Sequence, residues 1–372
     1  MHRSKKGLRG GSLKILYVIK GLGLGGAEQH LAQVAIAMQR RGHTVEVAYL
    51  LPGKSHLHAK LSSTGVRVSC WGAGGRLWWL ALWRPMWRAL HEFRPQVVHA
   101  HLPVPGMLMR LLKPLLGYRL IYTEHITWQL LHPATRWVHR LSWGLDDRAI
   151  SCSRGVADSY PRESLVIDNG ISGELPAPAR PGLHELLGLP ASALIWLCVA
   201  NFRPQKNHPL LLRAFDQACA DSQSPEWHLV LVGQDATERD RCVALAKTLA
   251  SCQRIHFLGM HPDAGGLMPE AAGFCLSSRE EGLPIALLEA MRAGLPAVVT
   301  AVGGMPDVID AQTGRVVPSG ATEAFAAALA ELGRDPGLRH RLGTAAQARF
   351  HERYTETAML NRLDELYAEV VR

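Results

Sequence analysis

Short apolar segments alternate with segments of helical periodicity along almost the whole chain of 372 residues. Residues 14–19 form the first apolar run, and Leu31, Val34 and Met38 then recur at helical spacing up to Gly42, a residue typical of helix ends. Short strands separated by helices predict a parallel sheet with helices on both faces. In the first half of the chain we expect strands at 14–19, 45–50, 66–70, 97–100, 120–123 and 148–151.

The alternation pauses at residues 171–189, which are rich in proline and glycine, and then resumes. Because a single core stops growing near ~250–300 residues, this length and this pause predict two domains. Ligands bind at the carboxyl ends of strands in open parallel sheets, so two facing domains would place one site in the cleft between them. Further strands are expected at 194–200, 228–232, 254–258, 273–276, 297–300 and 315–317, followed by three helical segments that reach Arg372.

The fold class that follows is α/β, with two Rossmann-like, doubly wound parallel sheets. We expect a first domain at residues 1–170, a linker at 171–189 and a second domain at 190–350. Residues 351–372 are expected to form a C-terminal helix that returns to the first domain.

Positive charge is concentrated in the first half of the chain. Residues 1–180 contain 24 lysines and arginines against 10 acidic residues, whereas the remainder contains 17 against 22. The two parts therefore differ in sign within a chain of net charge +9. A basic half indicates a polyanionic partner, such as nucleic acid, anionic lipid headgroups or phosphates.

Neither a membrane span nor a cysteine framework is indicated. The best apolar candidate, residues 103–122, is interrupted by Arg110, Lys113 and Arg119, and a span needs about 18 residues. The apolar run after the basic N-terminus is short, so we expect no signal peptide. The seven cysteines contain no CxxC pair, which favours reduced, buried thiols in the cytoplasm over a zinc site or disulfides.

Gly21, Gly23 and Gly26 spell GxGxxG between a strand and a helix, the pattern of dinucleotide sites. The acidic residue that such sites place at the end of the second strand is missing, because Glu46 lies in mid-strand. We therefore interpret the glycines as a turn that brings backbone N–H groups and a helix N-terminus close to an anion.

The most informative motif is SSREEGLPIALLEAMRAGLP, residues 277–296. Pro284 suits the first position of a helix, where its missing N–H is not needed. Glu281 would then precede the helix and Glu289 would lie within it, about 12 Å away along the axis. That span approximates a diphosphate between a sugar and a ribose, and the N–H groups of residues 283–286 would point at the phosphates. A capped amphipathic helix with solvated glutamates is the alternative.

Two further loops follow strands of the second half. NFRPQKN, residues 201–207, places Arg203 and Lys206 where they would meet a leaving phosphate, with a solvated basic loop as the alternative. GGMPDVI, residues 303–309, is a glycine turn followed by a helix start.

Together these motifs resemble those of the retaining GT-B glycosyltransferases of family 4, a group rich in bacterial cell-envelope sugar transferases. EGLPIALLEA matches the family's Glu-x7-Glu motif, PQKN its lysine loop, GGAE at 25–28 its N-terminal loop, and IDNGI at 167–171 the segment before its linker. The resemblance covers nearly the whole chain. The chain departs from it at Asn201, where arginine is frequent, and at Asp307, where glutamate is usual; Arg203 is the candidate to replace the missing arginine.

The resemblance implies a nucleotide-diphosphate-sugar donor bound mainly by the second domain. Lys206, with Arg203, would neutralise charge that grows on the leaving diphosphate. Glu289 would accept hydrogen bonds from the ribose hydroxyls, and Glu281 would contact the donor sugar. The donor-binding residues implied are Gly25, Gly26, Asn201, Arg203, Lys206, Gly282, Leu283, Pro284, Ile285 and Glu289.

Residues of the first domain are implied as well. His125, in TEH at a strand end, matches a family histidine near the sugar, and His101 and Glu28 are expected on the acceptor side. The catalytic set implied is Lys206, Glu281, His125 and Arg203. The sequence contains no Asp-x-Asp motif, so we expect no metal ion and no cofactor, with lysine and arginine in place of a metal clamp.

Five of the ten tryptophans lie between residues 71 and 87, interleaved with arginines. A core-facing helix is one interpretation; an interfacial helix with aromatic anchors and cations for anionic lipid is the other. The basic first half favours the second, and no nucleic-acid-binding module is visible, so no nucleic-acid partner is expected. The expected lipid-facing residues are Trp79, Trp83, Trp87, Arg84 and Arg88.

By this resemblance the chain is expected to move a sugar, from a UDP-sugar by preference, to a lipid-linked or oligosaccharide acceptor in cell-envelope polysaccharide synthesis, including that of lipopolysaccharide. We expect it in the cytoplasm, peripherally bound to the inner face of the plasma membrane. A nucleotide-sugar epimerase on the same fold and a non-catalytic adaptor for anionic lipid are the alternatives. The presence of Lys206, Glu281 and Glu289 argues against the adaptor.

Overall fold

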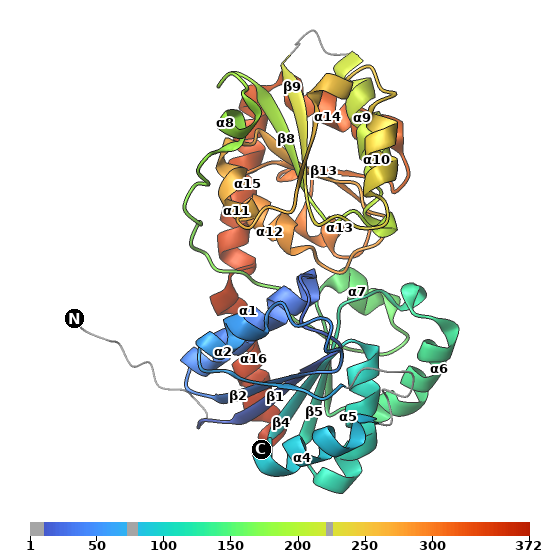
Figure 1. The fold of residues 1–372 in the computed structure, drawn as a ribbon, viewed down its shortest axis with the longest axis vertical. Helices are drawn as coiled ribbons and strands as arrows, with labels where there is room; N and C mark the ends of the chain where they lie inside the picture. Colours follow the sequence, from blue (N-terminus) through green and yellow to red (C-terminus); the bar gives the residue numbers. More distant parts are fainter. Residues whose placement is uncertain (1–10, 73–80, 221–225) are drawn as a thin grey trace, which may run out of the picture. The chain divides into compact units, whose positions relative to one another are not determined.

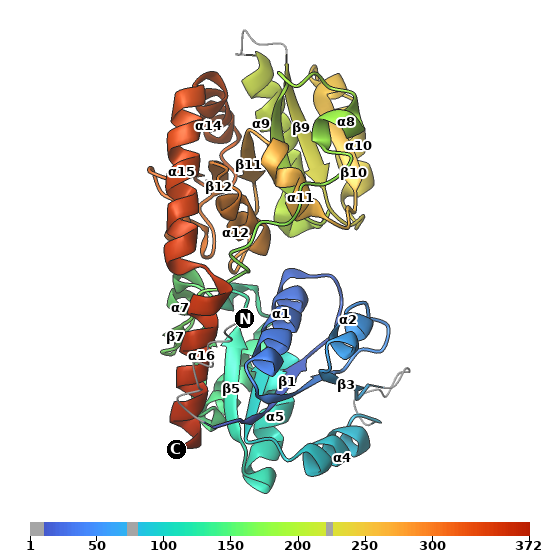
Figure 2. The same ribbon diagram turned by 90° about the vertical axis from the view of Figure 1, so that its left-hand side faces the viewer.

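The computed structural model describes residues 11–72, 81–220 and 226–372, which form two compact units. The first unit contains the described residues up to Asn169 together with Thr357–Arg372, and the second contains Gly170–Glu356. Each unit is an open parallel sheet with helices on its faces (Figure 1, Figure 2). The predicted α/β class with two Rossmann-like sheets is therefore confirmed.

The sheet of the first unit has the strand order β3-β2-β1-β4-β5-β6-β7, and all neighbouring strands are parallel. The order reverses between β1 and β4, which is where ligands bind in doubly wound sheets. β7 was not predicted, since two residues are too few to carry a pattern. The strands are β1 (Lys14–Ile19), β2 (Thr44–Tyr49), β3 (Arg67–Cys70), β4 (Val97–His101), β5 (Arg119–Glu124), β6 (Arg148–Ser151) and β7 (Leu165–Val166).

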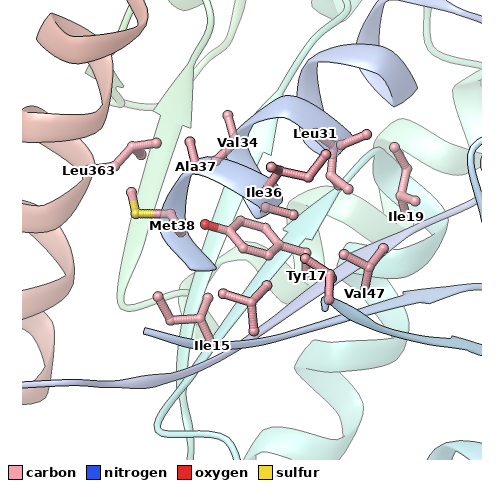
Figure 3. Close-up of a cluster of buried hydrophobic side chains, with 14 of the residues drawn as sticks. Ile15, Tyr17, Ile19, Leu31, Val34, Ile36, Ala37, Met38, Val47 and Leu363 are labelled. Carbon is pink, nitrogen blue, oxygen red and sulfur yellow. The ribbon is translucent and has the colours of Figure 1, made fainter. Parts of the chain in front are cut away.

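Helices cover both faces of this sheet. One face packs against α1, α2 and α16, and Figure 3 shows Leu363 of α16 in the same buried cluster as Met38 of α1 and Tyr17 of β1. The other face packs against α4 and α5 through a second cluster that includes Met86, Leu90 and Met109. The helices are α1 (Gly26–Arg40), α2 (His58–Ser63), α4 (Trp83–Phe93), α5 (Pro103–Leu116), α6 (Pro133–Ser142), α7 (Arg154–Ser159) and α16 (Glu356–Val371), with 3-10 turns η1 (Trp128–Leu130) and η2 (Trp143–Leu145).

The sheet of the second unit has the order β10-β9-β8-β11-β12-β13, again parallel throughout. Its strands are β8 (Leu194–Val199), β9 (Trp227–Val232), β10 (Ile255–Gly259), β11 (Gly273–Leu276), β12 (Ala297–Thr300) and β13 (Gly314–Val317). Its helices are α8 (Leu183–Leu187), α9 (His208–Ala220), α10 (Arg239–Ala246), α11 (Ala264–Leu267), α12 (Ile285–Arg292), α13 (Met305–Val308), α14 (Thr322–Arg334) and α15 (Pro336–Arg353), with 3-10 turns η3 (Pro204–Lys206), η4 (Cys252–Arg254) and η5 (Met268–Glu270).

The segment 171–189, expected as a linker, lies within the second unit and contains α8. Leu183 is fully buried there, and the N–H of Ala179 donates to the carbonyl of Gly266 at 2.9 Å. Proline and glycine interrupt regular structure in this segment, but its apolar side chains still bury against the second sheet. The boundary between the units consequently falls at Asn169 and Gly170.

Candidate functional site

The lysine loop of the second unit is tied to the loop that follows β11. η3 is the next element after β8, and Asn207 ends it with a positive φ of 50°. The N–H of Arg279 donates to the carbonyl of Gln205 at 2.7 Å, and the Ser277 hydroxyl donates to the carbonyl of Asn207 at 3.0 Å. β8 and β11 are neighbours in the sheet, so the two loops emerge side by side and hold each other.

This arrangement brings together Lys206 and Glu281, two of the predicted catalytic residues. The Lys206 Nζ lies 2.5 Å from Glu281 Oε1, and the Ser278 hydroxyl donates to the same oxygen at 2.6 Å. The two side chains are 21% and 10% exposed, so the ion pair is partly shielded from water. A shielded ammonium held by a carboxylate is already oriented when an anion arrives.

The glycine turn after β12 supports the backbone beside Glu281. Gly303 has a positive φ of 54°, and a Cβ at this position would lie 2.0 Å from the carbonyl oxygen of Glu281. The N–H of Gly304 donates to the carbonyl of Gly282 at 2.6 Å. Only glycine permits this close approach, which fixes the backbone of residues 281–282.

α12 begins one residue later than predicted. Pro284 occupies the N-cap, because its ψ of 125° is extended, and Ile285 is the first helical residue. The earliest N–H that bonds within the helix is that of Leu287, to the Pro284 carbonyl at 3.2 Å. The first turn of a helix has no carbonyl partners of its own, so the N-terminus of α12 can bind an anion.

Glu289 lies on α12, in a partly buried position. Burial raises the pKa of its carboxyl, whereas Arg292 lowers it and Asp263 raises it further. Within the described residues, its carboxylate has neither a hydrogen bond nor an ion pair. A carboxylate in this state can accept hydrogen bonds from hydroxyl groups.

Two other predicted donor-binding residues differ in their surroundings. The Asn201 side-chain oxygen accepts from the N–H of Gln234 at 3.0 Å, so it fastens the loop after β9. Arg203 is exposed at the start of η3, and none of the ion pairs among the described residues includes it. The guanidinium of Arg203 is therefore accessible to an anion.

In the first unit the glycine turn leads into α1, which starts at Gly26. The Glu28 carboxylate folds back over this turn: a Cβ on Gly25 would lie 2.3 Å from Glu28 Oε2. Glu46 lies in the middle of β2 and accepts a hydrogen bond from the Ser69 hydroxyl at 3.0 Å. Its carboxylate is thus bonded in mid-strand, whereas a dinucleotide site would need an acidic residue at the end of this strand.

His101 and His125 meet at the carboxyl ends of β4 and β5. His101 Nδ1 lies 2.8 Å from His125 Nε2, and the two rings stack with centroids 5.1 Å apart. The His99 ring is tilted against that of His101, with centroids 4.3 Å apart, and it bonds to the Tyr367 and Thr123 hydroxyls at 2.7 and 2.6 Å. The structure therefore brings His101 and His125 together and adds a histidine that the sequence did not single out.

A fourth histidine, His30 of α1, completes this cluster; its ring centroid lies 6.4 Å from that of His125. Burial lowers the pKa of His99 and His125 to about 3 and that of His30 to about 4, and it holds the pKa of His101 well below the usual range. All four rings are consequently neutral near pH 7. Alternation along β4 could have indicated His99, which shares a face with His101, but no sequence signal marks His30.

No group of three or more His, Cys, Asp or Glu side chains in the described part of the chain is arranged to hold a metal ion. This applies also to the cluster formed by His30, His99, His101 and His125.

The tryptophan-rich segment is only partly described, because Trp79 lies outside the described residues. Trp83 and Trp87 of α4 are 39% and 42% exposed, whereas Met86 and Leu90 of the same helix are buried. The core-facing interpretation of these two tryptophans is therefore wrong. Arg84 is exposed, and Arg88 bonds to Glu92 at 2.6 Å. None of the described helices is long and apolar enough to cross a membrane.

Comparisons with known proteins match both units. Residues 183–349 match the model of the glycosyl transferases group 1, and residues 24–172 match the model of glycosyltransferase family 4. The chain is 25% identical over 369 residues to the lipopolysaccharide core biosynthesis glycosyltransferase LpsD of Rhizobium meliloti, covering 95% of this chain and 98% of that protein. It is 27% identical over 362 residues to a D-inositol 3-phosphate glycosyltransferase of Actinosynnema mirum, covering 86% of each.

Among solved structures, Anabaena HepE in complex with UDP has a TM-score of 0.83 at 19% identity, covering 96% of this chain and 100% of that one. The likeness shows that the two parallel-sheet units have the GT-B fold, and the two family matches make the chain a glycosyltransferase. Its first unit carries a family 4 glycosyltransferase domain and its second a group 1 glycosyl transferase domain.

Proposed function

We propose that this glycosyltransferase transfers a sugar, with retention of anomeric configuration, from a nucleotide-diphosphate donor to a lipid-linked or oligosaccharide acceptor in cell-envelope polysaccharide synthesis. The observation that carries the proposal is the Lys206–Glu281 pair beside the N-terminus of α12. The solved complexes of HepE with UDP and with UDP-glucose support a UDP-sugar donor, and LpsD supports an envelope saccharide as acceptor.

In this proposal the second unit stabilises the leaving diphosphate. Lys206 and Arg203 provide positive charge, and the first N–H groups of α12 add hydrogen bonds. Glu289 accepts hydrogen bonds from the ribose hydroxyls, and Glu281 contacts the donor sugar while it orients Lys206. The interactions of Lys206, Arg203 and the α12 N–H groups strengthen as negative charge moves onto the diphosphate, which is the condition for accelerating the reaction.

The first unit supplies neutral groups. His125, whose pKa is lowered to about 3, can exchange hydrogen bonds with sugar hydroxyls but carries no positive charge at pH 7. His101 Nδ1 and His125 Nε2 share one hydrogen bond, in which one nitrogen donates and the other accepts, so the tautomers of the two rings are coupled. His101 and Glu28 are proposed to lie on the acceptor side. The acceptor attacks on the face from which the diphosphate leaves, and we name no covalent nucleophile.

Saturation-transfer NMR with UDP-, GDP- and ADP-sugars tests the donor. We expect UDP-sugars to give the strongest signals, and Glu289→Ala to weaken those of the ribose protons. Failure of every nucleotide sugar to bind would favour the non-catalytic adaptor. If the bound UDP-sugar changes into its epimer in the absence of acceptor, the chain is an epimerase instead.

Activity is expected to persist in excess EDTA. The charge that a divalent cation would neutralise is met by Lys206, Arg203 and the α12 N-terminus, so the proposal includes neither a metal ion nor another cofactor. Initial rates with and without EDTA, and after readdition of Mg²⁺ or Mn²⁺, provide the measurement. A strict dependence on either ion would contradict the metal-independent mechanism.

The proposal also places the chain in the cytoplasm, on the inner face of the plasma membrane, where lipid-linked acceptors would be presented. Partly exposed Trp83 and Trp87, with the exposed Arg84 and Arg88, are compatible with such contact.

A further inference from the structure

Two adjacent helices of the first unit, α5 and α6, carry large apolar side chains on the outside. Leu111 and Leu115 of α5 are 59% and 71% exposed, and Trp137 and Leu141 of α6 are 67% and 68% exposed. The spacing of four residues places each pair on one face of its helix. We call these four residues the α5–α6 face.

On their inner sides, α5 packs Met109 and Leu112 into the apolar core, and a buried polar network joins α5 to α6. Arg110 of α5 is fully buried and donates to the two carboxylate oxygens of Asp146 at 2.8 and 2.7 Å. It also lies 2.6 Å from Nδ1 of His139, the buried residue of α6, whose Nε2 lies 2.7 Å from Glu124. Surface helices of water-soluble proteins normally turn polar side chains to the outside, whereas α5 and α6 expose four large apolar ones. The exposed face is therefore adapted to an apolar medium.

These buried bonds also hold the two helices together. Arg110 bridges α5 to α6 and to the residue after η2, and Lys113 Nζ donates to the carbonyl of Leu145 at 2.7 Å. α5 and α6 lie side by side in the first unit (Figure 1). The four apolar side chains therefore lie on one rigid part of the structure, so binding loses little conformational entropy of the backbone.

The charges around this face are positive. Residues 125–145, which include all of α6, contain no Asp or Glu, and α5 contains none either. Arg136 and Arg140 alternate with Trp137 and Leu141, and no ion pair among the described residues involves either arginine. A second copy docked symmetrically on this face would bring identical arginines together, which is unfavourable. An anionic lipid surface offers phosphates to the arginines and acyl chains to the apolar side chains.

We propose that the α5–α6 face docks this chain on an anionic lipid bilayer. Trp137 and the leucines enter the boundary between headgroups and acyl chains, while Arg136 and Arg140 bind lipid phosphates. The inference rests on the proposed function in that a lipid-linked acceptor would be met at such a surface. It assigns the principal anchor to α5 and α6 rather than to α4, whose tryptophans are less exposed.

Cosedimentation of the full chain with vesicles tests this assignment. Wild-type protein is expected to pellet with phosphatidylglycerol–phosphatidylcholine vesicles and to stay in solution with pure phosphatidylcholine. Trp137→Ser with Leu141→Ser should lower the partition coefficient by about tenfold or more, since two apolar anchors are lost. Arg136→Gln with Arg140→Gln should lower it by about 25-fold at low salt, roughly fivefold for each arginine, and should flatten its salt dependence.

Leu175→Ser is the matched control, because Leu175 is 52% exposed but belongs to the second unit; it should bind vesicles like the wild type. The proposal would be overturned if both double variants bound vesicles as strongly as the wild type does. It would also be overturned if binding were lost only in the variant with Trp83→Ser and Trp87→Ser. A dimer in sedimentation velocity that Trp137→Ser dissociates, without vesicle binding, would identify a self-association face instead. UDP binding by each variant is measured separately, so failure of the donor site and failure of the lipid surface are distinguishable.

Discussion

Replacing Lys206 by alanine is expected to lower kcat by about 10²- to 10³-fold, the usual cost of removing one preorganised charge that stabilises a transition state. The Kd for the donor should change much less, because the negative charge on the diphosphate is largest when the bond to the sugar breaks. Kinetics at saturating acceptor together with calorimetric titration of the donor separate the two quantities. A loss confined to KM would contradict the role assigned to Lys206.

The ion pair with Glu281 makes controls necessary. Lys206→Ala leaves a Glu281 carboxylate that is only 10% exposed and that keeps its hydrogen bond from the Ser278 hydroxyl, so local distortion could imitate a catalytic effect. Glu281→Gln keeps the side-chain volume and leaves Lys206 in place, so a much smaller fall in kcat than that of Lys206→Ala would assign the effect to the ammonium. Lys247→Ala, which removes an exposed lysine at the end of α10, should have wild-type kinetics.

Acidification is expected to destabilise the first unit through its buried histidines. The pKa of His30 is lowered to about 4 in the folded chain, against about 6.5 when unfolded, so between these values the unfolded state binds more protons. Stability is therefore fully present above pH 6.5 and is lost as the pH falls toward 4. For His30 alone the loss between pH 7.5 and pH 5 is about 2 kcal/mol, and His99 and His125 act in the same direction. Urea unfolding curves at the two pH values measure it.

His30→Leu isolates one contribution. Nε2 of His30 contacts the sulfur of Met359 at 3.1 Å, an interaction that a leucine can replace by apolar packing. The variant should lose about 2 kcal/mol less than the wild type over the same pH interval. His91→Leu, at an exposed position of α4, should leave the pH dependence unchanged. Equal pH slopes for His30→Leu and the wild type would show that His30 becomes charged within the folded chain.

Burial also raises the pKa of the carboxyls of Glu46 and Glu289, which opposes the histidine effect as the pH falls. For these groups the folded state binds the additional proton, so they favour folding at low pH and lose that contribution as the pH rises. They are unaltered in His30→Leu, and the difference between the variant and the wild type therefore reports His30 together with its electrostatic coupling to His99 and His125.

The sequence by itself determined the two parallel sheets and most of their strands. Strand formation depends on apolar runs and helix formation on a period near 3.6, and both are local properties of the chain. For the same reason the strands 14–19, 148–151, 273–276 and 297–300 were predicted with the bounds that the structure has, whereas the two-residue β7 was missed. The motif spacing around Glu281 and Glu289 was also readable, since both lie within 20 consecutive residues.

Only the tertiary structure decided which distant residues meet. Lys206 and Glu281 are 75 positions apart and pair because β8 and β11 are neighbours in the sheet. His30, His99, His101 and His125 gather because α1 packs on a sheet in which β4 lies between β1 and β5. The buried polar network between α5 and α6 depends on Asp146 and Glu124 reaching Arg110 and His139. Such pairings are set by strand order and by the helix faces turned toward the sheet, and a periodic pattern contains information on neither.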